Sequence, residues 1–445
     1  MSEKNGRWSL LPAAGNVPAS LDGQWRGGSQ TDHIDKYLAR GGYAAAKRVV
    51  SEQSQADVLG LLEKSGLRGL GGGGFPVARK WRAALANEGP RYLVANAYDA
   101  DPAAPLCRAL LETNPHALLE GIVIAAHALG VQEAWVYAKA ENSAALRRLR
   151  AAVAEAEEQG YLGLSAFGGK LALQVHIFAS WGGFAGGEET AALEAIEGQR
   201  AMPRQKPPFP TESGLWGRPT VVHSAETLAN LPHLAADGAE AFGKGSKLLA
   251  LGGDVAKPGL VEVPFGTPLR QILTQWGGGP AAGQSPRAVQ IGGPTGAVLP
   301  ESLLDTPLGH DALREVGAFV GSGSLRVLGE KVCMVDFARG RMDYLAHESC
   351  GKCVPCRLGT NRLTGVLETI MSGLGRKDDL ALLDEFGNLL SQSSLCGFGL
   401  TAPTVLRTTM THFAEDYRVH IEEGRCPTAT CRALRTRGFE RKAAV

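Results

Sequence analysis

The stretch Glu348-Ser349-Cys350-Gly351-Lys352-Cys353-Val354-Pro355-Cys356-Arg357 holds three cysteines separated by two residues each. Thiolates at this spacing bind three irons of one cubane cluster, and the fourth iron takes a ligand from elsewhere in the chain. Cys396, in Ser394-Leu395-Cys396-Gly397-Phe398-Gly399, is the natural fourth ligand. The spacing therefore predicts a [4Fe–4S] cluster bound by Cys350, Cys353, Cys356 and Cys396.

Zinc is the main alternative for these cysteines. A tetrahedral zinc site usually takes its ligands in two separated pairs, which this spacing lacks. Cysteines that bind no metal are the other alternative. Lys352 and Arg357 stand beside the thiolates, where positive charge raises the potential of a cluster.

The four other cysteines carry a weaker signal. Eight cysteines without a secretory signal at the start of the sequence favour metal chemistry over disulfides. Cys107 and Cys333 lie in apolar stretches, typical of small core residues. Cys426 and Cys431 are compatible with a second metal site or a redox disulfide, but free thiols in a mobile tail are favoured.

The sequence around the cysteines, from Glu330 to about Glu423, predicts a helical domain. Its expected helices are Thr360–Gly373, Asp378–Gln392 and Thr401–His420, with the cysteines in the loops that open and interrupt them. Before it, Ser246 to about Gly323 has short β-branched runs between glycines and prolines, such as Lys247–Gly252 and Gly259–Val263. This texture predicts a β-rich domain of the ubiquitin-like grasp type.

Residues from about 35 to 240 alternate short apolar runs with helical patterns, which predicts an α/β layer domain. The expected strands are Tyr92–Asn96, Glu133–Ala138 and Leu171–Ala179, and the expected helices include Ala144–Gln159 and Glu188–Glu197. The longest apolar run, Ala117–Val131, is too short to span a bilayer. It is interpreted as a buried helix with Asn114 as N-cap, Pro115 in its first position and Gly130 at its end.

Composition sets further limits. The chain has 46 basic and 45 acidic residues, so nothing indicates a nucleic-acid-binding arm or a membrane-surface patch. Its 58 glycines are about 13% of the chain, roughly twice the usual share. They gather at Gly69–Gly74, Gly182–Gly187 and Gly277–Gly279, which is typical of tight turns around ligands.

The first glycine loop runs from Arg68 to Pro76 and is followed by Lys80. Without Cβ atoms its amides can approach a phosphate or a flat ring, and Lys80 can neutralise negative charge. A flexible surface turn is an equally good interpretation. The second loop, Gly182–Gly187, leads to Glu188 and Glu189 at the start of a helix, where carboxylates also simply stabilise the helix dipole.

Together these segments resemble the family of the 51 kDa flavoprotein subunit of respiratory complex I, which includes the diaphorase subunits of NAD-linked formate dehydrogenases and hydrogenases. The resemblance runs from about His33 to His420. The matching motifs, in order, are Ser65–Gly69, Gly72–Pro76, Gly187–Thr190, Lys206–Pro210, Glu226–Asn230 and Glu348–Arg357.

The resemblance implies a Rossmann-like FMN-type domain with an NADH site stacked on the flavin, a β-grasp domain of the soluble-ligand-binding type, and a helical bundle holding the cluster. It implies that FMN is lined by Gly69, Gly71, Lys80, Asn96 and Gly187. It implies that the dinucleotide faces Glu188, Glu189, Phe75, Lys206 and Phe209, although Lys206 and Phe209 suit surface or core roles equally well. The expected divisions are 1–34, an N-terminal extension; 35–245, the FMN/NADH-type domain; 246–325, the β-grasp domain; 326–425, the cluster domain; and 426–445, a basic tail.

The departures from the family pattern fall at the flavin and nucleotide site. Leu70 stands where members usually have Arg, and Tyr98 replaces a carboxylate in a run where Asp99 and Asp101 are each shorter than the usual Glu. His223-Ser224 replaces an Asn-Asn pair. Tyr98 and Trp181 are bulky enough to narrow the cavity.

Two functions remain open on this evidence. The first is an NADH dehydrogenase or diaphorase-type oxidoreductase subunit that passes electrons between NAD(H), FMN and the [4Fe–4S] cluster. The second is an electron-relay or structural subunit that has lost FMN or NADH binding; a third variant keeps FMN with another donor. The resemblance implies a thioredoxin-like [2Fe–2S] partner and a larger Fe–S, molybdenum or hydrogenase-type subunit. A cytoplasmic location is expected, with any membrane association through partners.

Overall fold

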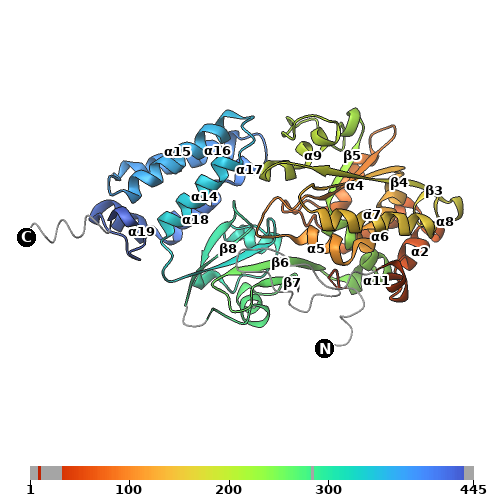
Figure 1. The fold of residues 1–445 in the computed structure, drawn as a ribbon, viewed down its shortest axis with the longest axis horizontal. Coiled ribbons are helices and arrows are strands. Elements are labelled where there is room, and N and C mark those ends of the chain that lie inside the picture. Colours follow the sequence, from red (N-terminus) through yellow and green to blue (C-terminus); the bar gives the residue numbers. More distant parts are fainter. Residues whose placement is uncertain (1–8, 12–32, 282–284, 435–445) are drawn as a thin grey trace, which may run out of the picture. The chain divides into compact units, whose positions relative to one another are not determined.

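The computed structural model describes residues 9–11, 33–281 and 285–434. Two compact units make up the chain (Figure 1). Unit 1 comprises Met1–Gly182, Glu189–Ala250 and Gly259–Thr267. Unit 2 comprises Gly183–Glu188, Leu251–Pro258 and Pro268–Val445.

Unit 1 is built around a five-stranded sheet of order β3-β4-β2-β1-β5. Its strands are β1 (Tyr92–Ala97), β2 (Glu133–Lys139), β3 (Gly163–Ser165), β4 (Leu171–Ser180) and β5 (Thr220–Ser224). β4, β2, β1 and β5 run parallel, while β3 pairs antiparallel with β4. Strand β1, which lies between β2 and β5, is largely apolar and buried, as is typical of a parallel strand covered on both faces. The predicted strands at 92, 133 and 171 are confirmed.

The strand order changes direction next to β1. From β1 the chain adds β2 and β4 on one side, and it then returns to place β5 on the other side of β1. In parallel sheets such a reversal leaves a crevice outside the carboxyl ends of the two flanking strands, where ligands bind. The carboxyl ends of β1 and β5 are therefore the expected position of a site.

The helices of unit 1 pack on this sheet and on one another. They are α1 (Ile34–Ala39), α2 (Ala44–Glu52), α3 (Gln55–Ser65), α4 (Val77–Leu85), α5 (Leu106–Thr113), α6 (Pro115–Leu129), α7 (Ser143–Glu158), α8 (Ala166–Gly169), α9 (Glu189–Ile196), α10 (Ala225–Ala229) and α11 (Leu231–Phe242), with a short 3₁₀ turn at Leu215–Gly217. The predicted helices at 144 and 188 correspond to α7 and α9 within one residue at each end.

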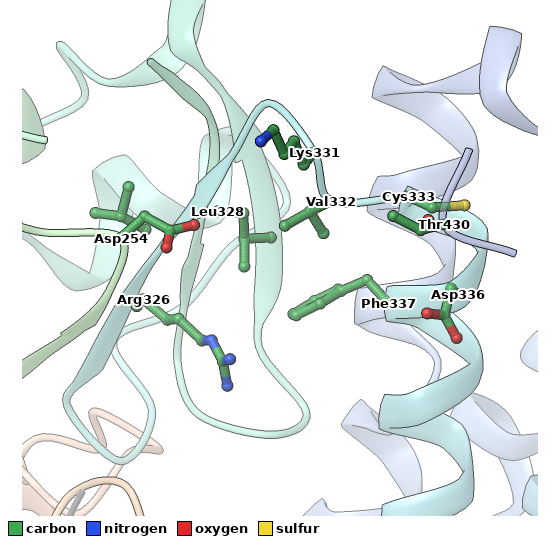
Figure 2. Close-up of a pocket in the computed structure, with 11 residues that line it drawn as sticks. Asp254, Arg326, Leu328, Lys331, Val332, Cys333, Asp336, Phe337 and Thr430 are labelled. Carbon is green, nitrogen blue, oxygen red and sulfur yellow. The ribbon is translucent and has the colours of Figure 1, made fainter. Parts of the chain in front are cut away.

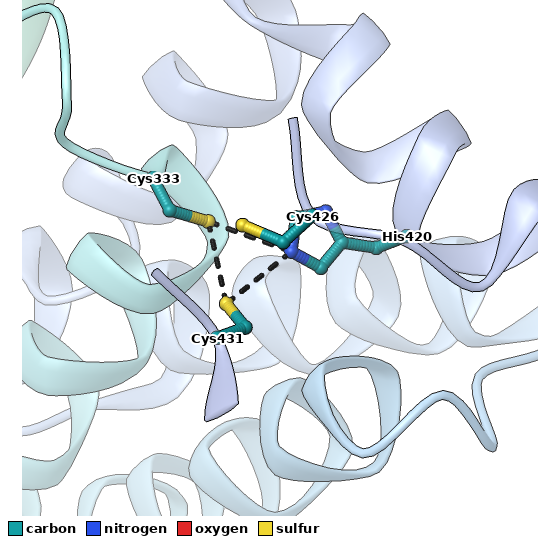
Figure 3. A group of neighbouring side chains, drawn as sticks. All are labelled: Cys333, His420, Cys426 and Cys431. Atoms are coloured by element: carbon teal, nitrogen blue, oxygen red, sulfur yellow. Dashed lines mark hydrogen bonds between the residues drawn. The ribbon is translucent and has the colours of Figure 1, made fainter. Parts of the chain in front are cut away.

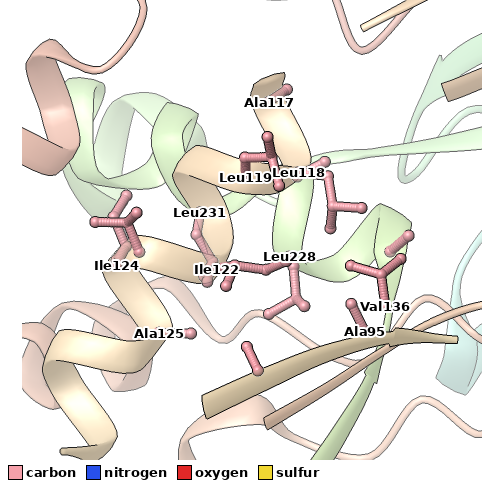
Figure 4. Close-up of a cluster of buried hydrophobic side chains, with 14 of the residues drawn as sticks. Ala95, Ala117, Leu118, Leu119, Ile122, Ile124, Ala125, Val136, Leu228 and Leu231 are labelled. Carbon is pink, nitrogen blue, oxygen red and sulfur yellow. The ribbon is translucent and has the colours of Figure 1, made fainter. Parts of the chain in front are cut away.

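Helix α6 is the centre of the unit 1 core. All of its residues except His127 are buried, and Leu118 and Ile122 lie among side chains of α10, α11 and the sheet (Figure 4). Pro115 opens the helix and Gly130 ends it at a φ of 66°, as the sequence predicts. Asn114 occupies the N-cap position, but its side chain makes no capping bond; its amide instead donates to the carbonyl of Leu10.

The one acidic residue of α6 has a structural role. Glu120 is buried and accepts hydrogen bonds from the Tyr37 hydroxyl at 2.5 Å, the Tyr43 amide at 2.9 Å and the Ala46 amide at 3.0 Å. Because a buried carboxylate is stable only when such donors surround it, this residue fixes α1 and α2 against the core.

A second sheet has the order β7-β6-β10-β8-β9. Its strands are β6 (Ser246–Gly253), β7 (Gly259–Pro264), β8 (Pro286–Ile291), β9 (Ala297–Pro300) and β10 (Ser324–Gly329), with short helical segments α12 (Leu269–Gln271), η3 (Ile272–Trp276), η4 (Glu301–Leu303) and α13 (His310–Glu315). β8 pairs antiparallel with β10 and with β9. The predicted strands near 247 and 259 are confirmed.

The carboxyl-terminal part of unit 2 is helical. It contains α14 (Met334–Glu348), α15 (Val354–Met371), α16 (Asp378–Ser393), α17 (Gly397–Thr401), α18 (Thr404–His412), α19 (Ala414–Arg418) and the π-helical turn η5 (Val419–Glu423). α14 packs on α15 and α18, and α15 packs on α16, around buried leucines such as Leu345, Leu363 and Leu406.

The prediction of one helix over Thr401–His420 is wrong. The chain breaks between α17 and α18 at Pro403, which has no amide proton to continue a helix. It breaks again at Phe413, whose φ of −130° is not helical. No helix among the described residues is long and apolar enough to cross a membrane.

Candidate functional site

The first glycine loop closes on itself before α4. The Gly69 amide donates to the Phe75 carbonyl at 2.9 Å, and the Arg68 guanidinium donates to the Gly74 carbonyl. Gly72 and Gly74 have φ values of 121° and 60°, conformations that favour glycine. Within the residues that the structure describes, no protein group accepts from the amides of Gly71, Gly72 or Gly73, so these donors are available to a ligand.

The same loop lies against the end of β5. The Leu70 amide donates to the Thr227 hydroxyl at 2.8 Å. A Cβ on Gly71 would lie 3.2 Å from the Cβ of Ser224, so a larger residue there would push the loop away. Ser224 in turn caps α10 by accepting from the Thr227 amide. The loop is thereby held at the carboxyl end of β5, beside the point where the strand order reverses.

Two lysines and one carboxylate stand at this position. The Lys80 ammonium, on α4, donates to Glu189 at 2.9 Å and to the Val222 carbonyl of β5 at 3.1 Å. The Lys206 ammonium donates to the other oxygen of Glu189, also at 2.9 Å. Burial alone would raise the pKa of Glu189, but the two lysines outweigh it and lower that pKa to about 2. Two ammonium groups share one carboxylate, which leaves an excess of positive charge.

His223 occupies the end of β5 as a neutral base. Its Nε2 accepts from the indole N–H of Trp81 at 2.9 Å. Burial and the nearby charge of Lys80 lower the pKa of His223 to about 3. The histidine that replaces the family's first asparagine therefore adds no charge, and it fixes α4 against β5.

The altered run at the end of β1 serves local structure. Asn96 accepts from the Tyr98 amide through its side-chain oxygen at 3.1 Å. Asp99 has a φ of 48° and accepts from the amides of Cys107 and Arg108, which begin α5. Burial raises the pKa of Asp99 to about 6, although these two amides oppose the shift. The side chain of Asp101 closes a turn by accepting from the Ala103 amide.

The aromatic residues of the altered site differ in exposure. Tyr98 is buried, stacks on Tyr137 with ring centres 5.2 Å apart, and donates its hydroxyl to the Gly182 carbonyl at 2.6 Å. Trp181 is 72% exposed. Phe75 and Phe209, the aromatic residues predicted to face the dinucleotide, are about half exposed, as a stacking surface requires.

Residues Gly183–Glu188, which include most of the second glycine loop, belong to unit 2 and contact its cysteine-bearing segments. The Phe184 amide donates to Glu348 at 2.5 Å, two residues before Cys350. A Cβ on Gly183 would collide with the same carboxylate, so a larger residue there would displace the Glu348 side chain. The Phe184 ring lies 5.4 Å from the ring of Phe398, two residues after Cys396. Gly187 and Glu188 follow in the same loop.

Unit 2 also brings the four predicted cluster ligands together. Cys353 is the N-cap of α15, Cys356 lies in the first turn of that helix, and Cys396 is the N-cap of α17. Burial first, and then the charges of Cys353, Cys396 and Cys350, raise the pKa of Cys356 to about 11. The backbone amides of Phe398 and Gly399 donate to the sulfur of Cys396. Burial and the repulsion between charged sulfurs disfavour the thiolate forms, and bound metal ions offset both effects.

The prediction for the last two cysteines needs correction. Cys426 and Cys431 do not stand in a free tail; both are buried. They lie together with Cys333 and His420, two residues that sequence reasoning missed as partners. The sequence could not show this grouping because its members are far apart in the chain. Cys333 precedes α14, whereas His420 lies in η5 and the two other cysteines follow it. Cys107 is a buried core residue, as predicted.

A cavity of about 320 Å³ opens in unit 2 at the start of α14 (Figure 2). Its lining includes the charged residues Asp254, Arg326 and Lys331 and the apolar side chains of Val332 and Phe337. None of the residues predicted to bind flavin, dinucleotide or cluster lines it. Cys333 does, so the cavity reaches the edge of the second cysteine group.

The three parts of the chain each match a family model. Residues 62–233 match the Nuo51 FMN-binding domain, residues 249–298 the SLBB domain, and residues 336–420 the NADH-ubiquinone oxidoreductase-F iron–sulfur binding region. A flavin-binding α/β domain joined to an iron–sulfur helical domain defines the class as an electron-transfer flavoprotein subunit with an iron–sulfur centre.

Similar proteins narrow this class. The chain is 39% identical to the NADP-reducing hydrogenase subunit HndC of Solidesulfovibrio fructosivorans, over 91% of this chain and 84% of that one. It is also 39% identical to the F 2 subunit of the NADH-quinone oxidoreductase of Rhizobium meliloti, over 88% and 96%. A crystal structure of an NAD⁺-reducing [NiFe]-hydrogenase superposes with a TM-score of 0.78 at 29% identity, covering 95% of this chain and 72% of the other.

The chain belongs to the family of the NADH-binding 51 kDa flavoprotein subunit of complex I and its hydrogenase counterparts. It is an oxidoreductase subunit of the NADH dehydrogenase or diaphorase type, with an FMN-binding domain and a [4Fe–4S] binding region. The resemblance in sequence and the three-part fold expected from it are confirmed.

Proposed function

We propose that this chain passes electrons between NAD(H) and a [4Fe–4S] cluster, and that FMN binds at the carboxyl ends of β1 and β5. The observation that carries the proposal is the loop Gly71–Gly73. Its amides have no protein acceptor among the described residues, and they lie at the reversal of the strand order, where two lysines share one carboxylate. Unused donors with excess positive charge suit an anionic phosphate-bearing cofactor.

Each residue at this position has a distinct role in the proposal. Gly69 and Gly71 keep the loop backbone close to the ligand, and Asn96 presents a polar side chain at the end of β1. Lys80 provides positive charge. Its ammonium has three N–H groups, and the bonds to Glu189 and Val222 use two of them. The third is assigned to the cofactor.

The dinucleotide is assigned to the remaining residues. The exposed rings of Phe75 and Phe209 offer flat surfaces for stacking, and Lys206 with Glu189 offers charge and a hydrogen-bond acceptor. Gly187 is proposed to line FMN, and Glu188 is proposed to face the dinucleotide. The bound flavin supplies the exchange between hydride transfer and single-electron transfer, while the protein binds and orients both partners.

Cys350, Cys353, Cys356 and Cys396 are proposed to hold the cluster that receives or delivers the single electrons. The amides that donate to Cys396, and the cations Lys352 and Arg357, stabilise negative charge on such a cluster. The second glycine loop contacts the same segments through Glu348 and Phe398.

The proposal extends to partners and location. Because the relatives are subunits of hydrogenase and NADH-quinone oxidoreductase complexes, the chain is proposed to work with other subunits. A thioredoxin-like [2Fe–2S] subunit and a larger Fe–S subunit are the expected ones. A cytoplasmic location is proposed, with membrane association only through partners.

Replacing Lys80 tests the flavin site. Lys80→Met removes one of the two cations and is expected to weaken FMN binding by at least about tenfold, because a hydrogen bond to a charged group contributes about 1.5–3 kcal/mol. FMN released from the purified protein is measured by fluorescence, and NADH oxidation with an artificial acceptor is followed in parallel. Lys170→Met, at an exposed lysine of unit 1, is the control and should match the wild type. FMN affinity unchanged in Lys80→Met would refute the assignment.

A further inference from the structure

A second group of metal-ligating side chains lies in unit 2, apart from the four predicted cluster cysteines. It consists of Cys333, His420, Cys426 and Cys431 (Figure 3). All four residues are buried, and one ligand atom from each lies within 4.8 Å of all the others. Cys333 is the N-cap of α14, His420 lies in the π-helical turn η5, and the two other cysteines follow that turn.

The distances within the group match the edges of a tetrahedral zinc site. The sulfurs of Cys333 and Cys431 are 3.7 Å apart, and the Nε2 of His420 lies 3.5 Å and 3.4 Å from them. Zinc bonds of about 2.3 Å to sulfur and about 2.0–2.1 Å to nitrogen, at tetrahedral angles, require edges of about 3.75 Å and about 3.5 Å. The side chains of Cys333, Cys431 and His420 thus already stand where a single zinc ion would hold them, and the sulfur of Cys426 lies within 4.8 Å of their ligand atoms.

The histidine is oriented for this role. Its Nδ1 donates to the backbone carbonyl of Asp416 at 2.6 Å, so that the lone pair of Nε2 points to the sulfurs. The buried carboxylate of Asp416 accepts from the Met334 amide at 3.1 Å and pairs with Arg287. One residue therefore fixes both the imidazole and the start of α14, directly after Cys333.

The sulfurs also receive hydrogen bonds suited to thiolates. The Asp336 amide donates to Cys333, and the Cys431 amide donates to Cys426. The hydroxyls of Thr428 and Thr430 lie 3.3 Å and 3.7 Å from the sulfur of Cys426. Donors of this kind support the negative charge that metal-bound cysteines carry.

The loop that carries the last two cysteines is shaped to bring them back to η5. Gly424 ends the turn with a φ of 60°, and Ala429, between the cysteines, has a φ of 55°. An alanine in the left-handed region costs free energy and persists where surrounding contacts require it.

We propose that Cys333, His420, Cys426 and Cys431 form a closed structural site for one Zn²⁺ that fastens the segment after η5 to the start of α14. A cubane is excluded because each of its four ligands binds a different iron, whereas these ligand atoms surround a single point. A disulfide requires sulfurs about 2.05 Å apart, much closer than Cys333 and Cys431. Only His420 lies within the matched iron–sulfur binding region, residues 336–420, so the site is an addition to it.

The test is the metal content of the full-length protein, purified anaerobically from cells grown with added zinc. About one zinc per chain, beside about four irons, is expected. Full iron occupancy means that the zinc is not in the cluster site. X-ray absorption at the zinc edge should show three sulfurs at about 2.3 Å and one nitrogen at about 2.0–2.1 Å.

Variants locate the ion. The double variant Cys426→Ser with Cys431→Ser should lose the zinc and keep the iron, whereas Cys107→Ser, at a buried cysteine of unit 1, should keep both. The proposal is overturned by wild-type protein without zinc, by iron in its place, by zinc retained in the double variant, or by a mass two hydrogens lower that maps to a disulfide among these cysteines. If the double variant does not accumulate, the ligand count from X-ray absorption decides.

Discussion

Cys396→Ser is expected to remove the [4Fe–4S] cluster and with it electron transfer beyond the flavin. Cys396 is buried at the start of α17, where two backbone amides point at its sulfur. Serine is a poor ligand for iron, and its shorter side chain retreats from the other three cysteines. Iron and acid-labile sulfide per chain should fall from about four each to well below half, together with the visible absorption of the cluster.

Cys107→Ser is the control for this experiment. Cys107 is also buried, but it lies in α5 of unit 1 and no cluster role is proposed for it. It should retain full iron. An unchanged iron content in Cys396→Ser would show that another residue is the fourth ligand.

Lys247→Met is expected to destabilise unit 1 by about 3–5 kcal/mol, since it leaves a buried carboxylate without its charge partner. The Lys247 ammonium is fully buried and donates to Glu226 at 2.6 Å and to the Leu248 carbonyl at 2.8 Å. The Leu248 amide donates to the other oxygen of Glu226 at 2.7 Å. This network links α10 to β6. It gives Glu226, the first residue of the motif Glu226–Asn230, a structural role.

Urea unfolding followed by tryptophan fluorescence measures this loss. Adding Glu226→Leu to Lys247→Met should recover much of the stability, because replacing both buried charges with apolar groups removes the unpaired carboxylate. Lys170→Met should leave the unfolding curve unchanged. If Lys247→Met unfolds at the same urea concentration as the wild type, the stabilising role of the Lys247–Glu226 pair is contradicted.

The sequence predicted those features that depend on local pattern. The strands β1, β2 and β4 and helix α6 follow from apolar runs, and Asn114, Pro115 and Gly130 mark the ends of that helix, so their positions were accessible. The spacing of Cys350, Cys353 and Cys356 is itself a local signal for a cluster. The prediction of one helix from Thr401 to His420 failed because an apolar periodicity continues across Pro403 and Phe413, where the backbone does not.

Features made by distant segments were not accessible. Nothing in the sequence places Cys333 beside His420, because the contact depends on how α14 packs against α18 and α19. Likewise, the run Cys426-Pro-Thr-Ala-Thr-Cys431 has no pattern that distinguishes a buried ligand pair from a free tail. His420 stands alone at the end of an expected helix, and a single histidine there does not indicate a metal ligand.

The residues that depart from the family pattern near the glycine loop make specific structural contacts. Asp99 caps α5, His223 receives the indole N–H of Trp81, and the Leu70 amide is bound by Thr227. Tyr98 is part of the core and donates its hydroxyl to the Gly182 carbonyl. These contacts hold the glycine loop, α4 and the start of α5 in place, and Leu70 and Tyr98 are uncharged where the family pattern has charged residues.

The most direct test of electron transfer by this chain is an anaerobic titration of the purified protein with NADH. The protein should contain both FMN and about four irons, and NADH should bleach the flavin band and then produce the paramagnetic signal of a reduced [4Fe–4S] cluster. Dithionite should give the same final spectrum. Iron without flavin, or flavin and cluster that dithionite reduces but NADH does not, would contradict the proposal that this chain carries electrons between NAD(H) and the cluster.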